Sequence, residues 1–176
     1  MYSPLLFIHP LIAGKHPQPP FHRRKTPTAT FPSPENTMVK AITLHQHGGP
    51  QVLKYEDVEV GDPKEGEIRI KHKAIGINFC DVYMRKDLYQ VSPPLPYTPG
   101  LEGAGVVTAV GAGVTACKVG DLVAYGTMDV VGSYSEERIL RANLAVPVPS
   151  SIDPVIAASI IFKGFTAQLL VRDSTP

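Results

Sequence analysis

Apolar and polar side chains alternate along several short stretches of this chain, the pattern of strands that bury one face. Residues 39–45 and 53–60 both alternate, and Gly48-Gly49-Pro50 between them predicts a turn that pairs the two strands. Residues 67–77 alternate between isoleucines and basic residues in the same way. Further strands are expected at residues 103–110, 119–125, 133–140 and 144–146. Many short strands separated by turn residues predict a mainly β fold with short helices, arranged as a barrel.

Two helices interrupt this β pattern. A short one is expected to begin near Phe79 and to end before Pro93-Pro94. A longer one is expected after Asp153-Pro154, which combine a capping oxygen with a proline in the first turn. Its apolar residues recur every three or four positions over about five turns: Ile156, Ile160, Ile161, Phe165 and Leu169. Such a stripe predicts a partner that covers it.

The first 37 residues differ from the rest of the chain. They hold 8 of the 18 prolines, and four basic residues against a single acid. This composition predicts a segment outside the fold, and two interpretations stay open: an organelle transit peptide, or a leader that precedes a true start at Met38. The expected organisation is therefore a leader at 1–37, a β domain at 38–152 and a helix at 153–176. The expected location is cytoplasmic, or plastid or mitochondrial if the leader is a transit peptide.

Composition excludes several classes of function. The formal net charge is +1, so the chain has no charge excess of the kind that binds nucleic acid. The two cysteines, Cys80 and Cys117, are too few for a disulfide scaffold and are expected to be reduced thiols. No run approaches the roughly 18 apolar residues of a membrane span, so a soluble chain without one is expected.

One glycine motif resembles a nucleotide site and is not expected to be one. The run Gly111-Ala112-Gly113-Val114-Thr115-Ala116 fits G-x-G-x-x-A and follows a predicted strand. A dinucleotide site also needs a helix directly after the glycines, whose N-terminus meets the pyrophosphate. Here a turn leads into another strand, so the motif predicts a hairpin.

Two runs carry the chemistry of interest. Residues 76–85 place Asn78 and Asp81 where a strand gives way to a helix, and residues 99–107 hold Glu102 as the one carboxylate of an apolar stretch. Together with residues 47–53, 119–125, 132–136 and 162–168, they resemble the NADPH:quinone oxidoreductases of the zeta-crystallin type, in the medium-chain dehydrogenase/reductase superfamily. The resemblance extends from residue 38 to about residue 172. It implies a GroES-like, partly open β-barrel, followed by the first interdomain helix of a Rossmann domain before which this chain is truncated.

The resemblance also implies a site and a cofactor. The residues that correspond to catalytic positions are Asn78, Tyr83 and Tyr89. Those that correspond to NADPH-binding positions are Phe79, Cys80, Asp81, Val82, Tyr83, Lys163 and Thr166. The residues also allow roles other than those that the resemblance implies. Asn78 and Asp81 could simply cap the short helix, and Lys163 could extend into water. Glu102 is assigned no catalytic role, and could be a remnant of a zinc site or a satisfied buried carboxylate.

No metal is expected. Zinc-dependent members of the superfamily have a cysteine where this chain has Asn78, and a histidine where it has Leu101. An amide and an isobutyl group cannot replace a thiolate and an imidazole on Zn²⁺. The alternative of a zinc alcohol dehydrogenase is therefore disfavoured.

The function implied by the resemblance is zinc-independent hydride transfer from NADPH to a quinone-like small molecule or a related enone, by an enzyme that is a homodimer when complete. Without a metal, the acceptor carbonyl would be polarised by Asn78, by Tyr83 or by bound water. A second hypothesis is a truncated, non-catalytic isoform or gene-model fragment that acts at most as an interaction module. Whether a partner covers the predicted stripe from Ile156 to Leu169 distinguishes the two hypotheses, because an interaction module requires such a partner.

Overall fold

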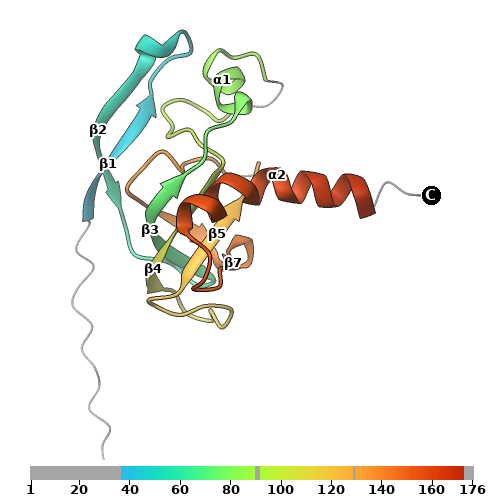
Figure 1. Cartoon of the computed structure of the whole chain (residues 1–176). Helices are drawn as coiled ribbons and strands as arrows, with labels where there is room; N and C mark the ends of the chain where they lie inside the picture. The colour runs from blue at the N-terminus through green and yellow to red at the C-terminus, as the bar shows by residue number, and fades with distance from the viewer. Residues whose placement is uncertain (1–36, 90–91, 129, 173–176) are drawn as a thin grey trace, which may run out of the picture. The chain divides into compact units, whose positions relative to one another are not determined.

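The computed structural model of the chain describes residues 37–89, 92–128 and 130–172. The predicted leader, apart from Thr37, lies outside these residues. Within them the fold is mainly β, with two α-helices and two short 3₁₀ helices (Figure 1). In chain order the elements are β1 (Thr37–Leu44), η1 (Pro50–Val52), β2 (Leu53–Val60), β3 (Glu67–Ile75), α1 (Phe79–Arg85), β4 (Glu102–Val110), β5 (Leu122–Gly126), β6 (Glu137–Arg141), η2 (Ala142–Leu144), β7 (Val146–Pro147) and α2 (Pro154–Arg172).

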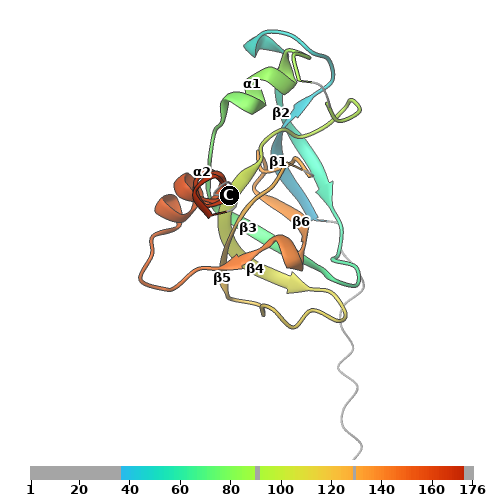
Figure 2. The same ribbon diagram turned by 90° about the vertical axis from the view of Figure 1, so that its right-hand side faces the viewer.

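Strands β1 and β2 form the predicted antiparallel hairpin, from the Leu44–Leu53 pair to the Thr37–Val60 pair. A separate segment fastens this hairpin to the rest of the barrel. The Ile42 N–H donates to the Tyr134 carbonyl over 2.7 Å, and the Glu136 N–H donates to the Lys40 carbonyl over 2.9 Å. The hairpin is thereby held beside the larger sheet (Figure 2).

The larger sheet has the strand order β6-β3-β4-β5-β7, and all its pairs are antiparallel. Its inner face forms the main core, with the predicted Ile68 and Ile70 fully buried at its centre. Strand β3 ends at Ile75, two residues earlier than predicted. Strands β4 and β5 pair directly, which confirms that Gly111 and Gly113 lie in a hairpin connection.

Helix α1 is fixed at both of its ends. At its start, Asp81 Oδ2 accepts a hydrogen bond from the Asn78 backbone N–H over 2.9 Å, which is half of a capping box. At its end, the Arg85 guanidinium donates to the Gly48 carbonyl over 2.6 Å, and the Gly48 N–H donates back to the Arg85 carbonyl. The capping role considered for Asp81 is therefore present.

Helix α2 begins as predicted, because Asp153 Oδ1 accepts a hydrogen bond from the Val155 N–H over 2.7 Å. The apolar stripe predicted to need a covering partner is not the face that packs on the sheet. Small residues, Ala157 and Ala158, form its buried face against Ala104 and Ala124 of the sheet. Of the predicted stripe, Ile161 packs beside that cluster, whereas Ile156 and Ile160 are 55% and 54% exposed. Alanines allow the helix backbone to approach the strands closely, which larger side chains would prevent.

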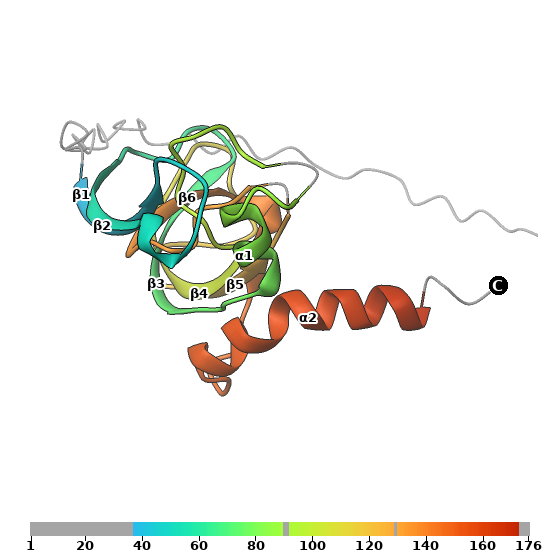
Figure 3. The same ribbon diagram turned by 90° about the horizontal axis from the view of Figure 1, so that it is seen from above.

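The second half of α2 extends past the edge of the sheet (Figures 1 and 3). Its exposed apolar residues point in several directions and include Phe165, Leu169, Leu170 and Val171. By length and composition alone α2 could cross a membrane, although polar residues such as Lys163 interrupt its apolar run. The core helix of a soluble protein also passes this test, so the finding is weak support for a membrane span.

Candidate active site

Three elements far apart in the sequence meet at one group of side chains. Asn78 precedes α1, Glu102 is the first residue of β4, and Lys163 lies in the middle of α2. Hydrogen bonds join all three side chains, so the structure brings together two of the predicted residues, Asn78 and Lys163. Glu102, which had been assigned no catalytic role, stands at their centre.

The Glu102 carboxylate accepts hydrogen bonds from three donors. Oε1 accepts from Lys163 Nζ over 2.6 Å and from Asn78 Nδ2 over 2.8 Å. Oε2 accepts from the backbone N–H of Phe162 over 3.1 Å. The carboxylate is 0% exposed, whereas the Lys163 side chain is 56% exposed. A buried negative charge is thus paired with a cation that still reaches the surface.

The backbone leaves room for this carboxylate at Gly76. A Cβ atom built on Gly76 would lie 2.3 Å from Glu102 Oε1 and 2.4 Å from Cδ. Any side chain at residue 76 would therefore occupy the position of the Glu102 side chain. The glycine could be read from the sequence, but its partner could not, because they lie 26 residues apart and meet only through the pairing of β3 with β4.

The network fixes the orientation of the Asn78 amide. Its Oδ1 accepts from Lys163 Nζ over 3.0 Å, while its Nδ2 donates to Glu102. Rotating the amide by 180° would place an oxygen against the carboxylate and an NH₂ against the ammonium, which both repel. An amide nitrogen carries two N–H donors, and one of them remains available for a further acceptor.

Asp81 forms a second polar position beside this network. Its Oδ2 accepts from the Tyr134 hydroxyl over 2.8 Å as well as from the Asn78 N–H. Its buried Oδ1 has no partner among the residues that the structure describes. Burial raises the pKa of this carboxyl, and the hydrogen bonds from Asn78 and Tyr134 oppose that shift. Burial and the hydrogen bond to Asp81 also raise the pKa of Tyr134 well above its usual range.

The other predicted site residues lie around this network without joining it. Phe79 is 80% exposed and Tyr83 is 46% exposed, so both present aromatic surface to solvent, and Phe79 directly follows Asn78 in the chain. Cys80 and Val82 are half-buried on α1, and Tyr89 is exposed in the loop after it. The Thr166 hydroxyl donates to the Phe162 carbonyl of its own helix, one turn earlier.

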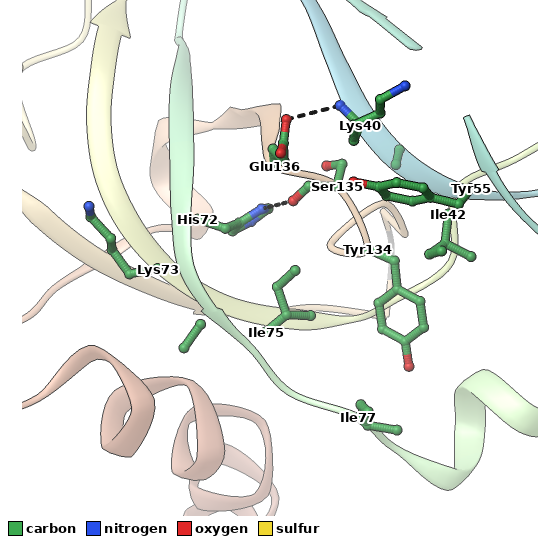
Figure 4. Close-up of a pocket in the computed structure, with 12 residues that line it drawn as sticks. Lys40, Ile42, Tyr55, His72, Lys73, Ile75, Ile77, Tyr134, Ser135 and Glu136 are labelled. Carbon is green, nitrogen blue, oxygen red and sulfur yellow. Dashed lines mark hydrogen bonds between the residues drawn. The ribbon is translucent and has the colours of Figure 1, made fainter. Parts of the chain in front are cut away.

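A groove lies elsewhere, between β1, β3 and residues 134–136 (Figure 4). It has a volume of about 570 Å³ and touches the Asn78 region only through Ile77 and Tyr134. Its polar atoms are largely satisfied: His72 Nδ1 bonds to the Ser135 carbonyl over 2.6 Å, and the Lys40 N–H donates to Glu136 (Figure 4). We therefore place the candidate active site at the Asn78–Glu102–Lys163 network.

Titration of His72, which lines this groove, is expected to make the stability of the fold depend on pH. Desolvation of the ring lowers the pKa of His72 to about 4 from an ordinary value of 6.5, although the bond to Ser135 opposes that shift. The unfolded chain therefore binds a proton more readily, and stability is lost as pH falls from 6.5 toward 4, by up to about 3 kcal/mol. Denaturant unfolding across this range is expected to show the loss in the wild type and a flatter profile in His72→Gln. An equally steep profile in the variant would contradict the assignment.

No three His, Cys, Asp or Glu side chains gather closely enough to hold a metal ion within residues 37–89, 92–128 and 130–172. At the two positions discussed for zinc, Leu101 is fully buried and the Asn78 amide bonds to Glu102 and Lys163.

Residues 64–150 match the alcohol dehydrogenase GroES-like domain. A quinone oxidoreductase of Pseudomonas aeruginosa is 45% identical over 137 residues, which are 78% of this chain and 42% of that protein. The crystal structure of Escherichia coli quinone oxidoreductase complexed with NADPH matches with a TM-score of 0.73 and 41% identity, over 77% of this chain and 41% of that one. A 2-haloacrylate reductase of Burkholderia sp is 39% identical over 142 residues, 78% of this chain and 42% of that protein.

These matches and the barrel define a GroES-like domain, and the chain belongs to the medium-chain dehydrogenase/reductase superfamily. Within that superfamily it is a homologue of the quinone oxidoreductases, as the sequence motifs predicted. The chain spans about 42% of the length of the curated relatives that it matches.

Proposed function

We propose that this chain carries the substrate- and nicotinamide-facing part of an NADPH-dependent reductase of quinones or related enones, which transfers hydride without zinc. The observation that supports the proposal is the Asn78–Glu102–Lys163 network, which presents an amide donor and a cation at the surface of a domain homologous to quinone oxidoreductases. One of these homologues was crystallised with NADPH. The 2-haloacrylate reductase among the relatives supports an activated carbon–carbon double bond as an alternative acceptor.

The described residues fit one end of NADPH. A free amide N–H, an ammonium and two exposed aromatic rings, Phe79 and Tyr83, suit a planar nicotinamide with its carboxamide group. The pyrophosphate of NADPH would need a glycine-rich turn that opens a helix. The one G-x-G-x-x-A run of the described residues lies in the β4–β5 connection and opens no helix. These residues therefore fit the nicotinamide end, and the proposal assigns them no role toward the phosphates.

Bound NADPH would supply the hydride, and the protein would position the acceptor and stabilise charge. The free N–H of Asn78 would donate to the carbonyl oxygen of the acceptor, where negative charge develops as hydride arrives. The Lys163 ammonium, 3.0 Å from Asn78 Oδ1, would stabilise the same charge. Phe79 and Tyr83 would cover the ring faces and exclude water, and Tyr89 would border the acceptor side.

The test is a chimera in which residues 38–172 of this chain replace the matching part of the Escherichia coli enzyme, 42% identical over 135 residues. We expect NADPH-dependent reduction of 1,4-benzoquinone, followed by absorbance at 340 nm, that a metal chelator does not abolish. Asn78→Ala in the chimera is expected to lower kcat/KM by about 100-fold, the typical cost of one donor to a developing oxyanion.

Gly164→Ala serves as the matched control for Asn78→Ala, because a Cβ atom at residue 164 meets nothing within 4 Å. A folded chimera without turnover would overturn the reductase proposal. It would favour the interaction module, which the exposed apolar residues of α2 independently support. Full activity in Asn78→Ala would remove Asn78 from the mechanism.

A further inference from the structure

We propose that Glu102 is a positioning residue that sets the orientation of the Asn78 amide and holds the Lys163 ammonium beside it. The inference rests on the proposed function, since it assigns to Glu102 the geometry of the two groups that would face acceptor and nicotinamide. It gives a role to a residue that the sequence alone left as a buried carboxylate.

The first argument is the energetic cost of burying Glu102. Taking an ionised carboxylate out of water costs several kcal/mol, and a buried ion pair is frequently no more stable than well-packed apolar residues. Its neighbours Leu101 and Ala104 are fully buried and apolar, so an apolar residue would suit that environment. Stability of the core alone does not account for a carboxylate here.

The second argument is the identity of its partners. Glu102 binds one side chain from the start of α1 and one side chain and one backbone N–H from α2, so each oxygen reaches a different point of the site. Both side chains are long enough to rotate away if unbound, and Lys163 is more than half exposed. Of the three side chains in the network, the Glu102 carboxylate is the one held in place, because it packs directly against Gly76 and is fully buried.

The third argument is that a carboxylate is the one side chain of this size that satisfies every donor. Oε1 serves Asn78 and Lys163, while Oε2 serves the Phe162 N–H. A glutamine offers one oxygen and one NH₂, so one of these two groups of donors would face another donor. Glu102→Gln therefore disturbs the network with almost no change in volume.

The experiment uses the whole ¹⁵N-labelled chain and follows the side-chain NH₂ signals of Asn78 by NMR without ligand. In Glu102→Gln we expect these signals to move and their protons to exchange with solvent about tenfold faster, the change that follows from losing a hydrogen bond to a charged group. Glu137→Gln is the matched control: Glu137 is also mostly buried and pairs with Arg69 and Lys71, away from the site. This control is expected to leave the Asn78 signals unchanged.

A second stage adds NADPH to the same samples, and the dissociation constant is expected to rise about tenfold in Glu102→Gln. Unchanged Asn78 signals in Glu102→Gln, together with a lower melting temperature, would overturn the proposal and leave Glu102 a structural residue. If Glu102→Gln does not fold, Lys163→Met probes the same network from its exposed side, and the Asn78 signals must then move. If the wild type does not bind NADPH, the ligand-free signals still decide the role of Glu102, and turnover of the chimera decides the proposed function separately.

Discussion

Alanine at Gly76 will displace the Glu102 carboxylate and so separate Asn78 from Lys163. The new Cβ atom would lie 2.3–2.4 Å from three atoms of the fully buried Glu102 side chain. Overpacking of this kind costs about 1–3 kcal/mol, and the disrupted bonds to a charged group add to it. Denaturant unfolding is expected to show a loss of about 3 kcal/mol or more, and the Asn78 side-chain NMR signals are expected to shift.

Gly61→Ala provides the comparison for Gly76→Ala. Gly61 follows β2, and a Cβ atom there meets nothing within 4 Å. Its substitution is expected to change the free energy of unfolding by less than about 1 kcal/mol. Equal stability of the Gly76 and Gly61 variants would show that the backbone is not closed around Glu102.

Alanine at Gly126 will push α2 away from the sheet. The Cβ atom would lie 2.9 Å from Phe162 Cα, a backbone atom that can move only with its helix. A shift of the helix would loosen the packing of Ala157 and Ala158 and weaken the bond from the Phe162 N–H to Glu102. We expect a loss of about 1–3 kcal/mol in unfolding free energy, measured with denaturant.

Gly164→Ala, on the same helix two residues beyond Phe162, is the control for this prediction. It meets nothing within 4 Å, and alanine favours a helix over glycine by up to about 1 kcal/mol. The control should therefore be neutral or stabilising. Destabilisation by both substitutions to the same degree would argue against close docking of α2 at Gly126.

The strands were predictable because each signal is local. Alternation placed Ile68 and Ile70 in the core, and Gly48-Gly49-Pro50 placed the first hairpin. The same local reasoning correctly rejected a nucleotide site at Gly111 and Gly113, because the sequence predicted that a strand, not a helix, follows them. The GroES-like barrel follows from these elements and from the family motifs.

The face of α2 and the role of Glu102 were not predictable in the same way. Hydrophobic spacing identified a stripe that stays largely exposed, but not the face that packs on the sheet. The sheet accepts α2 where Gly126 and Ala104 leave space, and so contacts the alanines. Glu102 read as an isolated carboxylate because its partners lie 24 and 61 residues away. The sequence signal that could have indicated this role is Gly76. It follows the end of β3, and any side chain there would overlap that of Glu102.

The central claim is that the Asn78–Glu102–Lys163 network faces the nicotinamide of NADPH. The most direct measurement is an NMR titration of the ¹⁵N-labelled chain with NADPH, in the wild type and in Asn78→Ala. The account predicts saturable shifts that centre on residues 78–83 and on Lys163, and that weaken about tenfold or more in the variant. Shifts that centre on the hairpin at 111–116, or no shifts at millimolar NADPH in a folded chain, would contradict it.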